Sequence, residues 1–182
     1  MAKLVSKVYG DALFSLADEN QTIDEVWAEV KALRQIVAGN QELNKIMNHP
    51  AMTGEQKLSF ILEVFEGRLS QTMLGFLNII VKKGHFADLE SVLNYFDAQA
   101  KEYMHIGVVY VKTAAPINDT QKHKIEKRLL EVSEYETFEM NYEVDENLIG
   151  GMVIRIGDRV LDDSIRTKID DMTFQLKKVR LG

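Results

Sequence analysis

The sequence predicts an α+β protein, in which an all-α bundle of six helices precedes a small α/β domain with a mixed sheet and a C-terminal helix. Apolar residues recur every three or four positions as far as Tyr103, the spacing of helices that bury one face. From Gly107 onward, β-branched and aromatic residues form strand-like runs. A final run to Leu181 returns to helical spacing. We therefore expect two domains, residues 1–105 and residues 106–182.

Composition narrows the class of protein. Of the 182 residues, 46% are hydrophobic, which is enough for a core without disulfides, and none is cysteine, which excludes thiolate catalysis and Cys-ligated zinc. The net charge of -6 disfavours nucleic acid as a partner, because phosphate contacts need a basic face. The longest apolar run, residues 74–81, is far shorter than the ~20 residues of a spanning helix. Any membrane association would therefore come through another subunit.

Three helices are predicted before Pro50. The first covers residues 4–16, and the second starts at a capping box, residues 22–25. The second carries one apolar stripe: Ile23, Val26, Trp27, Val30, Leu33 and Val37. Gly39 and Asn40 end it, and a short third segment, residues 42–47, stops before the proline because the preceding residue avoids helical conformation.

Three more helices follow, joined by short polar connections that predict antiparallel neighbours. A second capping box, residues 53–56, begins the fourth helix. The fifth spans residues 70–83 and ends at Gly84, and the sixth is expected to be capped by Asp88 and to reach Tyr103.

Two of these helices break the one-face pattern. In the first, Phe14 lies opposite a stripe of Val5, Ala12 and Leu16, and in the fifth the small or apolar residues Gly75, Phe76 and Ile79 add to the main stripe. One interpretation is that the fifth helix is central in the bundle. The other is a groove between the two helices that accepts an amphipathic helix of a partner.

The second domain begins with a strand, residues 108–113, followed by a helix that Asn118 or Asp119 can cap. Residues 138–144 then alternate apolar and polar side chains, as in a strand with one wet face. A strand–helix–strand order predicts that the two strands are parallel in one sheet.

A hairpin comes next, with two glycines before it and one in its turn. Gly157 and Asp158 form a two-residue loop, whose register pairs Ile156 with Arg159, Arg155 with Val160 and Ile154 with Leu161. This register places Met152, Ile154 and Leu161 on the core face and brings Arg155 within reach of an ion pair with Asp162. Gly150 and Gly151 allow a close backbone approach or a positive φ.

The final helix is expected to be capped by Asp163 or Ser164. Its apolar residues follow heptad spacing: Ile165, Ile169, Met172, Leu176 and Val179. Charge is uneven around it, because residues 131–146 hold seven acids and no Lys or Arg, whereas Lys177, Lys178 and Arg180 are basic. Either these are solvated faces, or they are two docking surfaces of opposite sign.

No constellation of residues indicates catalysis. Asp158, Asp162 and Asp163 are accounted for by the turn, the ion pair and the helix cap. The four histidines do not pair at i, i+4, and Ser164 lacks the setting of an activated nucleophile. We expect neither an enzyme, nor a bound metal, nor a cofactor.

Several stretches of the chain resemble those of a known family. Residues 144–165, with the string Gly-Gly…Gly-Asp…Asp-x-Ser, resemble the C-terminal signature of the delta subunit of F-type ATP synthase, whose mitochondrial relative is the oligomycin-sensitivity-conferring protein. Residues 9–17, His49-Pro50 with Lys57, and residues 76–84 are similar to the family's other motifs. The signature residues, to which we assign structural roles, are Gly150, Gly151, Gly157, Asp158, Asp162 and Ser164.

The resemblance implies a stator subunit of the peripheral stalk, present in a single copy and without catalytic residues. The first domain would bind an N-terminal helix of an alpha subunit, the second the ends of the b-subunit stalk, on the cytoplasmic face of a bacterial membrane. Combined with the groove above, it suggests an alpha-helix site made of Tyr9, Gly10, Leu13, Phe14, Ala17, Gly75, Phe76 and Ile79.

The alternative is an unrelated soluble helical adaptor or regulator with a partner-binding α/β module. It would share the composition and the lack of a catalytic constellation. The glycine-rich string discriminates between the two, since an unrelated adaptor has no reason to carry it.

Overall fold

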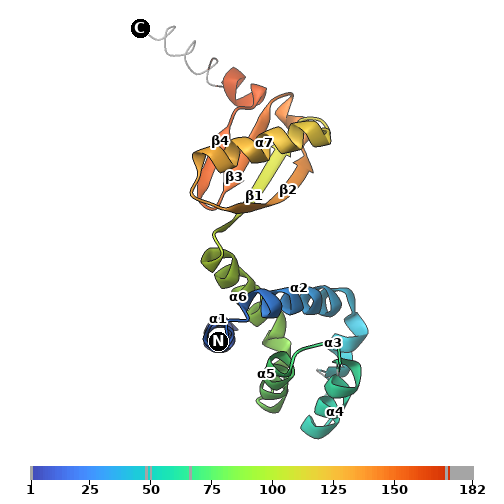
Figure 1. Cartoon of the computed structure of the whole chain (residues 1–182). Helices are drawn as coiled ribbons and strands as arrows, with labels where there is room; N and C mark the ends of the chain where they lie inside the picture. Colours follow the sequence, from blue (N-terminus) through green and yellow to red (C-terminus); the bar gives the residue numbers. More distant parts are fainter. Residues whose placement is uncertain (1, 48, 50, 66, 171, 173–182) are drawn as a thin grey trace. The chain divides into compact units, whose positions relative to one another are not determined.

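The computed structural model describes the whole chain except residues 1, 48, 50, 66, 171 and 173–182. The described chain divides into two compact units, Met1–Ala100 and Lys101–Gly182, which we treat separately (Figure 1). The first is all helical, and the second holds a four-stranded sheet with helices. The predicted fold class is confirmed.

The N-terminal unit follows the predicted order of helices. These are α1 (Ala2–Glu19), α2 (Ile23–Gly39), α3 (Gln41–Met47), α4 (Gly54–Phe65), α5 (Gln71–Lys82), the 3-10 turn η1 (Phe86–Asp88) and α6 (Leu89–Tyr103), whose last residues lie beyond Ala100. The capping box at Thr53 and Gln56 is present in both directions, with N···O distances of 3.3 and 3.0 Å. The same prediction for Thr22 was wrong, because its hydroxyl donates to the carbonyl oxygen of Ala17 instead of capping α2. Asp88 lies inside η1, where its carboxylate contacts His85 rather than capping α6.

Helix α6 is the centre of the first unit. Its inward face is fully buried at Val92, Leu93, Phe96 and Ala100, each 0% exposed. The face also carries a buried carboxylate, Asp97, which accepts a hydrogen bond from the Trp27 indole N–H (2.8 Å) and pairs with Arg34 (2.8 Å). Both partners come from α2, so these contacts hold α2 against α6. They also compensate the buried carboxylate of Asp97, which would be costly without partners.

The C-terminal unit is a mixed sheet covered on one face by a helix. Its elements are β1 (Ile106–Thr113), α7 (Asp119–Val132), β2 (Thr137–Val144), the 3-10 turn η2 (Glu146–Leu148), β3 (Met152–Ile156) and β4 (Arg159–Asp162). The strand order is β2-β1-β3-β4, with β1 and β2 parallel as predicted and the other pairs antiparallel. Helix α7 lies across the face that buries Val109, Val111 and Ile154 (Figure 1).

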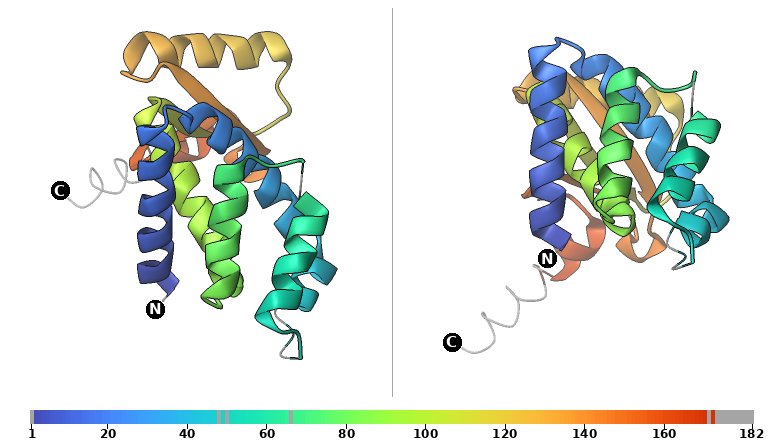
Figure 2. Two further views of the ribbon diagram at one scale, coloured as in Figure 1. Left: turned by 60° about the horizontal axis from the view of Figure 1, so that its bottom comes forward. Right: turned by 90° about the horizontal axis from the view of Figure 1, so that it is seen from below.

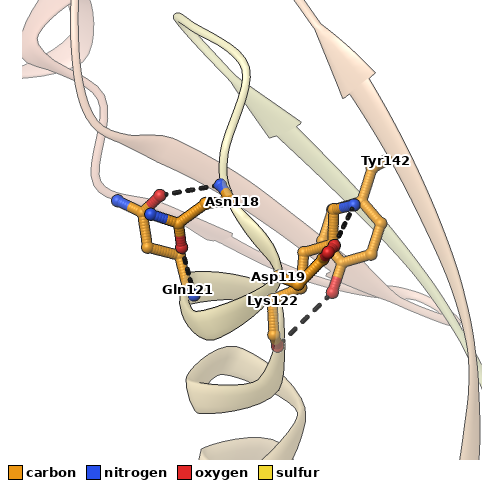
Figure 3. A network of polar contacts seen from close by, with 5 residues as sticks. All are labelled: Asn118, Asp119, Gln121, Lys122 and Tyr142. Carbon is orange, nitrogen blue, oxygen red and sulfur yellow. Dashed lines mark hydrogen bonds and ion pairs between the residues drawn. The ribbon is translucent and has the colours of Figure 1, made fainter.

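The start of α7 is tied to the sheet by a polar network (Figure 3). Asn118 and Gln121 form a reciprocal capping box with two N···O distances of 2.9 Å. Tyr142 on β2 donates its hydroxyl to the carbonyl oxygen of Lys122 in the first turns of α7. Burial raises the pKa of Tyr142 above its ordinary value.

The predicted hairpin register is confirmed at all three pairs. Two inferences drawn from it were wrong. Leu161 is 65% exposed although its partner Ile154 is buried, because β4 is the edge strand beyond the cover of the core cluster. The guanidinium of Arg155 lies 4.7 Å from the ring centre of Tyr110, its neighbour on β1, and does not pair with Asp162.

Candidate helix-binding surface

Helices α1 and α5 lie side by side in the first unit (Figure 2). They run in opposite directions (Figure 2). The ring of His85, which follows α5, packs on Tyr9 of α1 with ring centres 5.5 Å apart. Ser70, which precedes α5, is hydrogen-bonded to Glu29 of α2, the helix that directly follows α1. The end of α5 is therefore level with the first half of α1.

The eight residues predicted for the alpha-helix site are divided between the core and the surface. Gly10, Leu13, Ala17 and Phe76 are buried, so they support the two helices from within. Tyr9 and Phe14 are half-buried, and Phe14 packs on Phe96 of α6, with ring centres 6.0 Å apart. Only Gly75 and Ile79 are exposed, and Ile79 presents 51% of its surface to solvent.

The buried face of α1 is not the stripe that the sequence suggested. Val5 is half-buried, whereas Ala12 and Leu16 are exposed; the interior positions of α1 are Ser6, Gly10, Leu13 and Ala17. Gly10 is required there, because a Cβ atom would collide with the ring of Tyr95 on α6. Beside it, Asp11 accepts hydrogen bonds from Tyr95 (3.0 Å) and Gln99 (2.9 Å), which hold α1 on α6.

The sequence reasoning missed an exposed apolar row on α1. The row steps by four residues along one side of the helix: Leu4 (69% exposed), Val8 (56%), Ala12 and Leu16 (42%). Regular i, i+4 spacing away from the buried positions was the available signal. We call this row together with Gly75 and Ile79 of α5 the α1/α5 surface. Exposed apolar residues grouped in this way are typical of interaction sites.

The signature residues of the second unit join the start of β3 to the start of the last helix. Gly151 has φ +79, and a Cβ there would meet the backbone of Asp163 and Ser164; a Cβ at Gly150 would meet Ile165. Two backbone bonds close this junction, from the amide of Asp163 to Met152 (3.0 Å) and from that of Ile165 to Gly150 (2.9 Å). The glycines are therefore structural.

Asp162 and Ser164 begin the final helix, of which residues 165–170 and 172 are described as helical. The Ser164 hydroxyl accepts from the amide of Thr167 (3.2 Å), so Ser164 is the cap, whereas Asp163 pairs with Lys168. The Asp162 carboxylate accepts from the Ser164 amide (2.9 Å) and the Thr167 hydroxyl (2.8 Å), and these bonds hold its pKa below the ordinary value.

The remaining signature residues form the turn. Gly157 has φ +55 and occupies the first loop position, followed by Asp158, which is the pattern of a type II′ hairpin. Among the described residues no three His, Asp or Glu side chains gather at a distance suited to a metal ion.

Comparison with known proteins decides the family. Residues 5–176 match the family described as ATP synthase delta (OSCP) subunit. The chain belongs to this family. It is 46% identical over 182 residues to the ATP synthase subunit delta of Lachnoclostridium phytofermentans, covering all of both chains. It is 31% identical to that of Brevibacillus brevis over 97% of this chain and 99% of the other.

A solved structure agrees on the fold. A chain in the cryo-EM structure of the Toxoplasma gondii mitochondrial ATP synthase hexamer superposes with a TM-score of 0.74 at 21% identity, covering 94% of this chain and 96% of that one. Family membership makes this chain a peripheral-stalk subunit of F-type ATP synthase, a structural rather than a catalytic component. An unrelated adaptor is not supported, since the match spans nearly the whole chain. Every helix in the described part of the chain is too short or too polar to cross a bilayer.

Proposed function

We propose that this chain links the catalytic head to the b-subunit stalk and resists the torque of the rotor, with one binding surface in each domain. In this proposal residues 1–105 bind the N-terminal helix of an alpha subunit on the α1/α5 surface. The carrying observation is the apolar exposure there. Leu4, Val8, Leu16 and Ile79 are 42–69% exposed on two neighbouring helices whose opposite faces are buried. An amphipathic helix is the partner whose apolar face fits such a surface.

The energetics favour a helix held by apolar contacts. Complete burial of a Leu, Ile or Val side chain contributes about 1.5–3 kcal/mol, so apolar contacts on this surface would supply the main favourable part of the binding free energy. The contacts of Gly10 and Asp11 with α6 keep α1 in place. The surface is therefore preformed, which lowers the entropic cost of binding.

For residues 106–182 we propose binding of the b-subunit ends, with the final helix as the docking element. Its described heptad residues Ile165, Ile169 and Met172 are 43%, 47% and 64% exposed. The rest of the predicted seam lies outside the described residues. The other candidate for this contact is the acidic segment, residues 131–146. Its charge is partly neutralised, because Glu139 pairs with Lys101 (2.7 Å) and Glu143 with Lys112 (3.0 Å). In this arrangement the protein lies on the cytoplasmic face of a bacterial membrane and associates with it only through the complex.

The test is a calorimetric titration of a synthetic peptide, taken from the N-terminus of the alpha subunit, into the full chain. Ile79→Asp places a charge in the centre of the α1/α5 surface and should weaken binding at least about tenfold. The matched control is Leu62→Asp. Leu62 is a 39% exposed residue of α4, which lies on the far side of α5 from α1 (Figure 2). The Leu62→Asp variant should bind the peptide with an affinity within about twofold of the wild type. Equal affinity of both variants and the wild type would exclude the α1/α5 surface.

A further inference from the structure

We infer that the α1/α5 surface fixes the direction of the helix it binds, through opposite charges at its two ends. The inference rests on the proposed binding of an amphipathic helix and goes further, since it specifies the partner's charge pattern. The partner should carry acidic residues at the end that lies toward Lys82 and basic residues at the end that lies toward Glu19.

The basic end is at the end of α5. Lys82 follows Ile79 by three residues and Gly75 by seven, so it shares their exposed face. Lys83 is adjacent and also exposed. The contact of His85 with Tyr9 places this end beside the first half of α1.

The acidic end is at the end of α1. Glu19 follows Leu16 by three residues and Ala12 by seven, so it continues the exposed apolar row. Asp18 is its exposed neighbour. Arg68, before α5, is an exposed cation at this end, and the two acids outnumber it.

Because α1 and α5 are antiparallel, the two charged clusters lie at opposite ends of the apolar surface. Both clusters are exposed, so each ion pair with a partner changes affinity by roughly fivefold at most. A reversed helix, however, would exchange two attractive ends for two repulsive ones. Apolar contacts alone would accept either direction of an amphipathic helix, whereas the charges discriminate between them.

The experiment uses the absence of cysteine in this chain. Single cysteines replace Leu4, at the basic end, or Asn20, next to Glu19 at the acidic end, both of them exposed. The probes are two designed amphipathic helical peptides of equal composition, each with an N-terminal cysteine. One carries Glu residues near its N-terminus and Lys residues near its C-terminus, and the other carries the reverse. Disulfide yields are measured under an oxidising glutathione buffer.

The Glu-first peptide should crosslink to Leu4→Cys several-fold more than to Asn20→Cys, and the Lys-first peptide should show the opposite preference. Exchanging the charges by Lys82→Glu with Glu19→Lys keeps the net charge and should invert or abolish both preferences. Lys45→Glu, an exposed change on α3, should leave them intact. Circular dichroism checks that each variant is folded.

Two results separate this inference from the proposed function. If both peptides crosslink equally at both ends, or if the exchange changes nothing, the surface binds helices without direction and the inference is overturned. If neither designed peptide crosslinks and the peptide from the alpha subunit does not bind the wild type, binding at this surface is itself refuted.

Discussion

Single residues of the family signature work through backbone geometry rather than through chemistry. Gly151 and Gly157 both have φ values that favour glycine, +79 and +55. Their surroundings differ, because Gly151 faces another stretch of backbone, at Asp163, whereas among the described residues no atom beyond the chain neighbours lies within 4 Å of a Cβ built on Gly157. The first glycine holds the junction between β3 and the final helix, and the second only makes the turn.

This difference predicts unequal costs of the same substitution. Gly157→Ala should destabilise the C-terminal unit by about 1–2 kcal/mol, the cost of a left-handed alanine. Gly151→Ala should cost about 2–5 kcal/mol, because overpacking against backbone adds to that strain. Urea unfolding followed by circular dichroism measures both. Trp27, the single tryptophan, reports on the N-terminal unit and should show an unchanged transition. Equal costs would refute the close-approach role.

At the scale of elements, the start of the final helix depends on a side-chain network. The Asp162 carboxylate at the end of β4 bonds to Ser164 and Thr167, and so connects the edge strand to the first helical turn. This explains why an aspartate three residues ahead of the helix belongs to the signature. The bonds are made to the ionised carboxylate, so the helix start is sensitive to acid.

The pH dependence follows from the direction of the pKa shift. The pKa of Asp162 is lower in the folded protein than its ordinary value of about 3.9. The stabilisation is therefore present at neutral pH, declines as pH falls below about 5, and is lost below the folded pKa. Asp162→Asn should destabilise the C-terminal unit at pH 7, and its difference from wild type should shrink as the pH is lowered. Asp158→Asn, in the hairpin turn, is the control. A difference that stays constant with pH would contradict the role of the charge.

For the whole molecule, a stator subunit has to hold two partners at once. The structure places exposed apolar residues in both units: Ile79 and its neighbours in the first, and Ile165, Ile169 and Met172 in the second. Each surface is made of residues of its own unit and needs none from the other to bind its partner. The proposed link between head and stalk therefore needs two independent sites on one chain.

Substitutions in the full chain should separate these sites. Ile79→Asp should weaken binding of the alpha peptide and spare binding of peptides from the C-terminal end of the stalk's b chains, and Ile169→Asp should do the reverse. Each loss should be at least about tenfold. Fluorescence anisotropy with labelled peptides measures both affinities for both variants, with circular dichroism as the control for folding. If either variant lost both partners while still folded, the division of labour would be wrong.

Much of this protein could be read from local sequence. A capping box at Thr53 and a cap at Asn118 place the starts of α4 and α7, and a two-residue loop at Gly157 fixes the register of β3 and β4, because these features depend on residues close together in the chain. The string from Gly150 to Ser164 identified the family, and its glycines, turn and helix cap each have a geometric role in the structure.

Only the tertiary structure decided which apolar residues are exposed. Helix α1 has apolar residues on more than one side, and only packing on α6 buries Gly10, Leu13 and Ala17 rather than Leu4 and Leu16. Leu161 is exposed because β4 is an edge strand, and Arg155 meets Tyr110 because β1 lies beside β3. Periodicity records which residues are apolar, whereas burial depends on neighbours that are distant in the chain. The sequence by itself therefore determined the elements and the family, and the fold determined the surface.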